Sequence, residues 1–142
     1  MSTGIERKKI LIIDDETDMR IFLCNLLGTC GFEPIDAEDR VQGLQKAKAE
    51  KPDLIILDVM MAGEAGIQMY RDLKSDEALK TVPVIMVSAI DKKIFLHYQK
   101  VQALPQAPEI PDPGAYLEKP LEAEELMQLV HRLTEKDACS PA

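Results

Sequence analysis

Carboxylates gather at the ends of two apolar segments of this chain. The stretch LIIDDE runs from apolar residues straight into Asp14, Asp15 and Glu16, and the stretch LIILD ends in Asp58. Carboxylates that lie close together repel one another and raise each other's pKa. A hard divalent cation such as Mg²⁺, which prefers oxygen ligands, relieves that repulsion. These acids therefore predict a magnesium site, provided that the fold brings the two segments together.

Each of these residues also has a simpler role when taken alone. A single aspartate after a strand is usually the N-cap of the next helix, and for Asp14 alone we favour that role. For Asp15 and Asp58 together, each at the end of a strongly apolar segment, we favour the cation site. Ser88 and Lys119 end two further apolar segments. Alone they indicate a turn hydroxyl and a solvated surface charge, and only their placement beside the acids makes them candidates for chemistry.

The segments that position these groups alternate between two periodicities. Short, apolar, β-branched segments predict buried strands, and apolar residues at helical spacing predict helices. Alternating strands and helices indicate an α/β fold with a parallel sheet covered on both faces. The expected strands are residues 9–14, 32–37, 54–58, 82–89 and 115–119, and the expected helices are residues 17–30, 40–50, 66–76, 92–104 and 122–136.

Five such units in 142 residues predict a flavodoxin-like, doubly wound (βα)5 domain. Its five-stranded parallel sheet would have the strand order 2-1-3-4-5, and ligands of such sheets bind beyond the carboxyl ends of the strands. Those ends carry the candidate residues. Pro34 indicates that the second strand lies at an edge of the sheet, and Gly31 is a natural end for the first helix.

The first two helices are expected to bury one apolar face each. Cys24 and Cys30 fall within the apolar pattern of the first helix, and we expect both to act as small core hydrophobes. The other residues expected to face inward are Met19, Phe22, Leu23, Leu26 and Leu27 in the first helix and Val41, Leu44 and Ala47 in the second.

Composition argues against several classes of function. The net charge of −8 disfavours nonspecific binding to nucleic acid, and every apolar run is too short to span a membrane. The cysteines lack CxxC spacing, so a zinc site is not expected. An odd number of cysteines without a signal peptide indicates a reducing cytoplasm. A nucleotide site is poorly supported, because neither a GxGxxG motif nor a P-loop is present.

Four motifs together resemble a known family. IIDDE, LIILDVMM, VIMVSA and YLEKP stand at the expected strand ends, and their order resembles that in the receiver domain of bacterial two-component response regulators. Each motif alone is a weak signal, whereas four in order are a strong one. The resemblance covers residues 8–133, which leaves residues 1–7 and 134–142 as expected flexible termini.

The resemblance implies Mg²⁺ as the cofactor and a role for each acidic residue. Asp58 is the expected phosphoryl acceptor. Asp14 and Asp15 are the expected acidic pair, with Asp15 the more direct metal ligand. Asp58 and the backbone carbonyl of Met60 are the further expected ligands of the ion.

Three other residues are expected to respond to the phosphoryl group. The resemblance implies that Ser88 is the switch hydroxyl and that Lys119 pairs with a phosphoryl oxygen. It implies that Tyr116 changes rotamer on activation, although a core aromatic accounts equally well for that position. It also implies a cis peptide bond before Pro120, although an ordinary proline that ends the strand before the next helix is the alternative.

By resemblance the chain is a signalling module rather than an enzyme. A sensor histidine kinase or a phosphotransfer protein would phosphorylate Asp58, with at most slow autophosphatase activity because Met60 and Ile90 are apolar. Phosphorylation would switch the face made by the fourth helix, fifth strand and fifth helix. A downstream protein or a second copy of the chain would bind there. Direct contact with nucleic acid and insertion into a membrane are not expected.

Several alternatives stay open at this point. A phosphorylation-independent pseudo-receiver would only bind partners, but every site position is filled. A magnesium phosphohydrolase would use Asp58 as nucleophile, but Met60 stands where that class typically has an acid. The proline-rich segment 104–114 is either a tolerated surface insertion or a docking segment. The chain is either a stand-alone receiver or a piece of a longer protein.

Overall fold

The computed structural model describes residues 7–58, 65–88, 115–119 and 121–134, with the side chains of residues 65–67 left aside. Strands and helices alternate along these segments. The strands are β1 (Lys9–Ile13), β2 (Glu33–Ala37), β3 (Leu54–Asp58), β4 (Val84–Ser88) and β5 (Ala115–Glu118), and the helices are α1 (Thr17–Thr29), α2 (Arg40–Glu50), α3 (Ala65–Ser75) and α5 (Ala123–Thr134).

The five strands form one parallel sheet with the order β2-β1-β3-β4-β5, which confirms the predicted topology. Pro34 lies in β2, an edge strand as predicted, where a missing N–H donor costs least. Gly31 follows α1 with a φ of +94°, a left-handed conformation that glycine adopts without strain, so its predicted role as a helix stop is confirmed.

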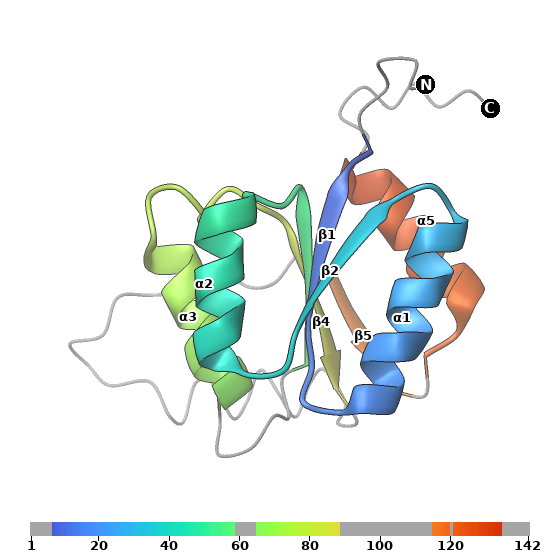
Figure 1. Ribbon diagram of the computed structural model, residues 1–142, viewed down its shortest axis with the longest axis horizontal. Helices are drawn as coiled ribbons and strands as arrows, with labels where there is room; N and C mark the ends of the chain where they lie inside the picture. Colours follow the sequence, from blue (N-terminus) through green and yellow to red (C-terminus); the bar gives the residue numbers. More distant parts are fainter. Residues whose placement is uncertain (1–6, 59–64, 89–114, 120, 135–142) are drawn as a thin grey trace.

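The helices cover both faces of the sheet. In Figure 1, α2 and α3 lie on one side of the strands, and α1 and α5 lie on the other. Because side chains alternate along a strand, β1 sends Leu11 and Ile13 to the cluster under α2 and α3, and Ile10 and Ile12 to the cluster under α1 and α5. Two apolar layers therefore hold the strand ends in fixed positions.

Three side chains in the first two helices that were expected in the core are exposed. Phe22 and Val41 are 43% and 65% exposed, and Cys30 is also exposed. Consecutive helix residues are about 100° apart, so the apolar run of residues 21–23 cannot face the sheet together. Leu23 is buried, and Phe22 therefore points away from the sheet.

Several predictions fall outside the described residues. They include the fourth helix (92–104), the proline-rich segment (104–114), the carbonyl of Met60, Ile90 and the peptide bond before Pro120. Among the helices that the structure describes, none has both the length and the apolar character needed to span a bilayer.

Candidate functional site

The carboxyl ends of four adjacent strands bring the candidate residues to one edge of the sheet. Asp14 follows β1, Asp58 ends β3, Ser88 ends β4, and Lys119 follows β5. The register aligns these ends, since Ile13 pairs with Leu57 and the backbone N–H of Lys119 donates to the carbonyl of Ser88 at 2.8 Å. The parallel sheet thus gathers residues that are far apart in the sequence.

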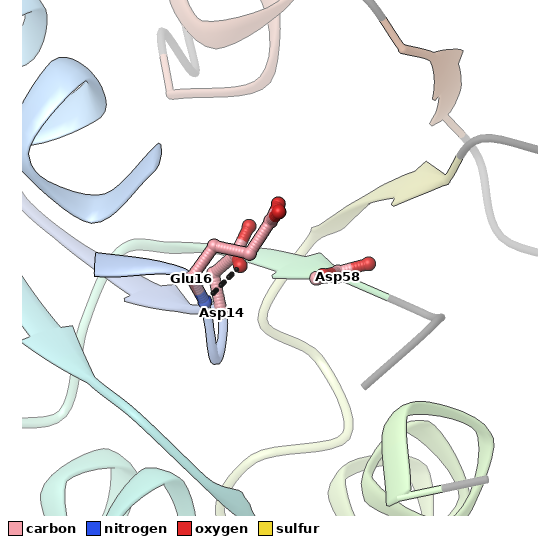
Figure 2. A group of neighbouring side chains, drawn as sticks. All are labelled: Asp14, Glu16 and Asp58. Atoms are coloured by element: carbon pink, nitrogen blue, oxygen red, sulfur yellow. Dashed lines mark hydrogen bonds between the residues drawn. The ribbon is translucent and has the colours of Figure 1, made fainter. Parts of the chain in front are cut away.

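Three carboxylates meet at this edge. One oxygen from each of Asp14, Glu16 and Asp58 lies within 4.8 Å of the others. Figure 2 shows Asp14 and Glu16 rising from the turn after β1, and Asp58 at the end of β3. Asp14 and Asp58 are only 2% and 3% exposed. Two buried acids without a countercharge are unfavourable, so this grouping requires a cation.

Lys119 supplies one positive charge to the three acids. Its Nζ lies 3.0 Å from an oxygen of Glu16, 3.4 Å from one of Asp58 and 3.7 Å from one of Asp14. The Lys119 side chain is 18% exposed, so these contacts are only partly screened by water. One ammonium facing three carboxylates leaves an excess of negative charge.

Burial and the neighbouring acids change the ionisation of Asp14. The pKa of Asp14 is raised from 3.8 to about 6, chiefly by burial and also by the charges of Asp58 and Glu16, while the N–H of Glu16 and the charge of Lys119 oppose the shift. Burial lowers the pKa of Lys119, but the hydrogen bond to Glu16 and the three negative charges outweigh it and raise the pKa overall. Lys119 therefore stays charged, and the acids compete for it.

The turn between β1 and α1 holds the acids in place. The Asp14 N–H donates to the carbonyl of Ala37 at 3.1 Å, and an Asp14 side-chain oxygen accepts from the Glu16 N–H at 2.8 Å. The N-cap of α1 is Glu16, so the N-cap role considered for Asp14 is wrong. Asp14 instead makes a bond to the N–H two residues on, which stabilises a tight turn.

Arg20 ties this turn to the edge of the sheet. Its guanidinium donates to the backbone carbonyl of Asp14 at 2.8 Å, to Asp36 of β2 at 3.1 Å and to the hydroxyl of Thr17 at 3.4 Å. Only 13% of the Arg20 side chain is exposed. The largely buried Arg20 side chain therefore fixes the β1–α1 turn, which carries three acidic residues.

The sequence-predicted residues are not all brought together. Asp14, Asp58 and Lys119 form the cluster, whereas Asp15 is exposed and is not part of the carboxylate group. Glu16, which the site prediction left out, takes the third place. Glu16 is the third acid of LIIDDE, so the sequence offered it as a candidate. A sequence alone does not show which of three successive acids points into the site.

Ser88 and Tyr116 lie at the strand ends as expected. Ser88 is fully buried at the end of β4. Tyr116 is half-buried and packs against the cluster under α2 and α3, so in this structure the aromatic belongs to the edge of the core. Their switching roles remain predictions.

The carboxylate cluster fits a magnesium ion. Mg²⁺ prefers hard oxygen ligands and commonly uses a small number of carboxylates together with water. Asp14, Glu16 and Asp58 offer oxygens of this kind close together, in a setting whose negative charge exceeds that of Lys119. The donor set therefore suits Mg²⁺ better than a soft metal, which would favour sulfur or imidazole.

Comparison with known proteins decides the family. The model of the response regulator receiver domain matches residues 10–131. This chain is a response regulator receiver domain. The match spans all the described strands except the first residue of β1, and it reaches into the last turn of α5.

Individual relatives agree with this assignment. The chain is 30% identical over 123 residues to protein PilH of Pseudomonas aeruginosa, a match that covers 87% of this chain and 94% of PilH. It is 37% identical over 82 residues to the phosphate regulon transcriptional regulatory protein PhoB of Escherichia coli, covering 58% of this chain. That match spans only 36% of PhoB, so the chain corresponds to about a third of that relative.

Solved structures share the fold. The chemotaxis response regulator CheY4 of Vibrio cholerae superimposes with a TM-score of 0.75 at 23% identity, covering 90% of this chain and 99% of CheY4. A CheY-like receiver domain protein of Methanospirillum hungatei gives a TM-score of 0.75 at 20% identity, covering 95% of this chain and all of that one. The flavodoxin-like architecture predicted from the sequence is therefore that of CheY-like proteins.

Proposed function

We propose that this receiver domain is a phosphorylation switch in which Asp58 accepts a phosphoryl group. The observation that carries the proposal is the position of Asp58, buried at the end of β3 with Lys119 Nζ 3.4 Å from one of its oxygens. A carboxylate attacks phosphorus only where negative charge on both partners is offset. Lys119 offers part of that offset, and the remaining charge calls for a divalent cation.

Asp14 and Asp58 would hold that cation, with Asp15 and the carbonyl of Met60 as further expected ligands. Bound Mg²⁺ supplies charge neutralisation and orients the phosphoryl oxygens. Asp14 is well placed because Arg20 and the N–H of Glu16 fix its backbone and side chain. The exposed Asp15 would act from the solvent side of the site.

The chemistry is a simple displacement. An oxygen of Asp58 forms the new P–O bond while the bond from phosphorus to the donor atom breaks, and the donor leaves with the electron pair. For a histidine donor the leaving atom is a ring nitrogen, which suits a sensor histidine kinase or a phosphotransfer protein as the source. Lys119 stabilises the charge that spreads over the phosphoryl oxygens.

The acyl phosphate adds charge and acceptor oxygens where Ser88 and Lys119 can reach them. Ser88 ends β4 and its carbonyl already accepts from the Lys119 N–H, so the two residues move as neighbours. A shift there would alter β5, which carries Tyr116, and the adjoining α5 surface. That surface is our proposed binding face for a downstream protein or a second copy of the chain.

Two further points belong to the proposal. Hydrolysis of the acyl phosphate would be slow, because Met60 and Ile90 provide no polar group to orient water. The domain would act in the cytoplasm, where its odd number of cysteines stays reduced. A pseudo-receiver without phosphorylation is less well supported, since the buried acids and Lys119 would then serve no evident purpose.

The proposal is tested by the intact mass of the protein after incubation with acetyl phosphate. We expect one phosphoryl adduct when Mg²⁺ is present and none when the metal is chelated. Asp58→Asn is the matched control, because it keeps the shape of the side chain and removes the nucleophilic oxygen. An adduct that persists in Asp58→Asn, or the lack of any adduct with Mg²⁺, would contradict the proposal.

A further inference from the structure

Glu16 is the nearest partner of Lys119. The Nζ of Lys119 lies 3.0 Å from Glu16 Oε1, closer than the 3.4 Å to Asp58 and the 3.7 Å to Asp14. An ammonium group has three N–H donors, and three carboxylates lie within reach of it. Lys119 donates hydrogen bonds to Glu16 and Asp58, with Asp14 in ion-pair range, so a phosphoryl oxygen that pairs with Lys119 competes with these carboxylates for it.

The side chain of Glu16 is the one that can leave. It is 61% exposed, whereas those of Asp14 and Asp58 are each 4% exposed. Moving Glu16 into water requires little reorganisation, because its charge is already largely hydrated. Asp14 is also held by a hydrogen bond from the Glu16 N–H, and Asp58 is the acceptor itself.

Glu16 occupies the N-cap of α1 but makes no side-chain capping bond. Glutamate is not among the preferred N-cap residues. The Glu16 carboxylate instead accepts a hydrogen bond from Lys119, which follows β5. Its oxygen also lies within 4.8 Å of a carboxylate oxygen of Asp58. An acyl phosphate on Asp58 would carry about two negative charges where the carboxylate carries one, and the added charge would repel Glu16.

We propose that Glu16 is a positioning residue that holds Lys119 in the unphosphorylated state and competes with the phosphoryl group for it. This inference rests on the proposed function and adds that Glu16 lowers the rate of phosphorylation. Glu16 must swing into solvent before Lys119 can stabilise the transferring group, so removing its charge accelerates phosphorylation. A role as an essential metal ligand would have the opposite effect, because losing a carboxylate weakens the site for Mg²⁺.

The test compares Glu16→Gln with the wild type for the rate of the phosphoryl adduct formed from acetyl phosphate. In this reaction an Asp58 oxygen bonds to phosphorus and acetate leaves with the electron pair. Calorimetry first fixes the Mg²⁺ concentration that saturates each protein, so that metal affinity does not enter the rate. Glu38→Gln is the matched control, since Glu38 is exposed just after β2 and loses the same charge.

We expect Glu16→Gln to react about two- to five-fold faster than wild type, as suits the loss of one partly exposed ion pair. Glu38→Gln should react at the wild-type rate. The ratio should shrink as salt is added, because ions screen the competing charge. A rate that is unchanged or lower, or an increase that salt does not affect, would overturn the proposal. Wild-type protein that forms no adduct would instead overturn the proposed function.

Discussion

Asp14 is buried beside two other carboxylates, and its ionisation opposes folding when no metal is bound. Its pKa is about 6 in the folded chain against a usual value of 3.8. Between these values the folded state binds more protons than the unfolded state, so stability falls as pH rises. The stabilisation is complete below the unfolded pKa and is lost as pH passes the folded pKa, amounting to roughly 2–3 kcal/mol.

Asp14→Asn should therefore stabilise the metal-free protein near neutral pH. We expect a gain of about 1–2 kcal/mol in the free energy of unfolding, less than the full penalty because Lys119 loses one partner. Urea unfolding with a metal chelator measures it. The gain should vanish as the pH drops toward 4, about where an unfolded aspartate takes up its proton.

Asp15→Asn is the control for that experiment. It removes the same charge from the adjacent residue, but Asp15 is exposed and lies outside the carboxylate group. Its stability in the chelator should stay within about 0.5 kcal/mol of wild type. Equal effects of the two substitutions at neutral pH would show that overall charge, rather than the burial of Asp14, sets the penalty.

Sequence reasoning at the residue scale identified Asp14, Asp58 and Lys119 but missed Glu16. The cause is the turn after β1. The strand ends at Ile13, so the directions of the three acids follow from the turn and not from strand alternation. Asp14 turns inward, Asp15 outward and Glu16 toward Lys119. Backbone geometry of that kind depends on Arg20 and Ala37, which lie elsewhere in the chain.

At the scale of elements, Arg20 links α1, the β1–α1 turn and β2. Replacing it with glutamine should lower the free energy of unfolding by about 1–2 kcal/mol, because shielded bonds to Asp14 and Asp36 are lost. It should also weaken Mg²⁺ binding, since the turn that carries two of the three acids is no longer fixed. Chemical unfolding and calorimetry give the two quantities.

Arg40→Gln provides the comparison for Arg20→Gln. Arg40 also pairs with an aspartate, Asp72, at 2.7 Å, but its side chain is 43% exposed and its partner belongs to α3 rather than to the acidic turn or β2. Exposed ion pairs contribute little, so we expect a loss below about 0.5 kcal/mol and unchanged Mg²⁺ affinity. If Arg40→Gln weakened Mg²⁺ binding as much as Arg20→Gln, the positioning role of Arg20 would be refuted.

Two helical glycines offer a matched test of packing. An added Cβ at Gly43 of α2 would lie 3.0 Å from side-chain atoms of Ile13 and of Met69, whereas one at Gly28 of α1 meets nothing within 4 Å. Gly28→Ala should gain a few tenths to about 1 kcal/mol from helix propensity. Gly43→Ala should lose about 1–2 kcal/mol through overpacking. Thermal unfolding measures both, and equal shifts would mean that α2 is packed no more closely than α1.

The strands were predictable because apolar runs buried on both faces leave few alternatives. β3 and α2 match their predicted bounds, and the ends of the other described elements differ from the prediction by at most two residues. Helix faces were harder to predict. Val41, in the first turn of α2, is exposed, while Leu44 and Ala47 pack against the core as expected. Burial at helix ends depends on neighbours that periodicity does not reveal.

At the scale of the whole molecule, the parallel sheet is what turns scattered residues into a site. Its strand order places β1, β3, β4 and β5 side by side, so their carboxyl ends share one edge. Two covered faces leave that edge as the place where polar groups can gather. The phosphoryl group proposed for Asp58 would thus sit at the end of strands that are packed on both sides, through which its effect would be transmitted.

The most direct test of this account is to identify which residue carries the phosphoryl group. Protein phosphorylated with acetyl phosphate and Mg²⁺ is reduced with borohydride, which converts an aspartyl phosphate to homoserine, and its peptides are sequenced by mass spectrometry. We predict homoserine at position 58 alone, and none in protein treated without Mg²⁺. Homoserine at position 14 or 15, or unreduced Asp58 in protein that carries the adduct, would contradict the assignment of Asp58 as the acceptor.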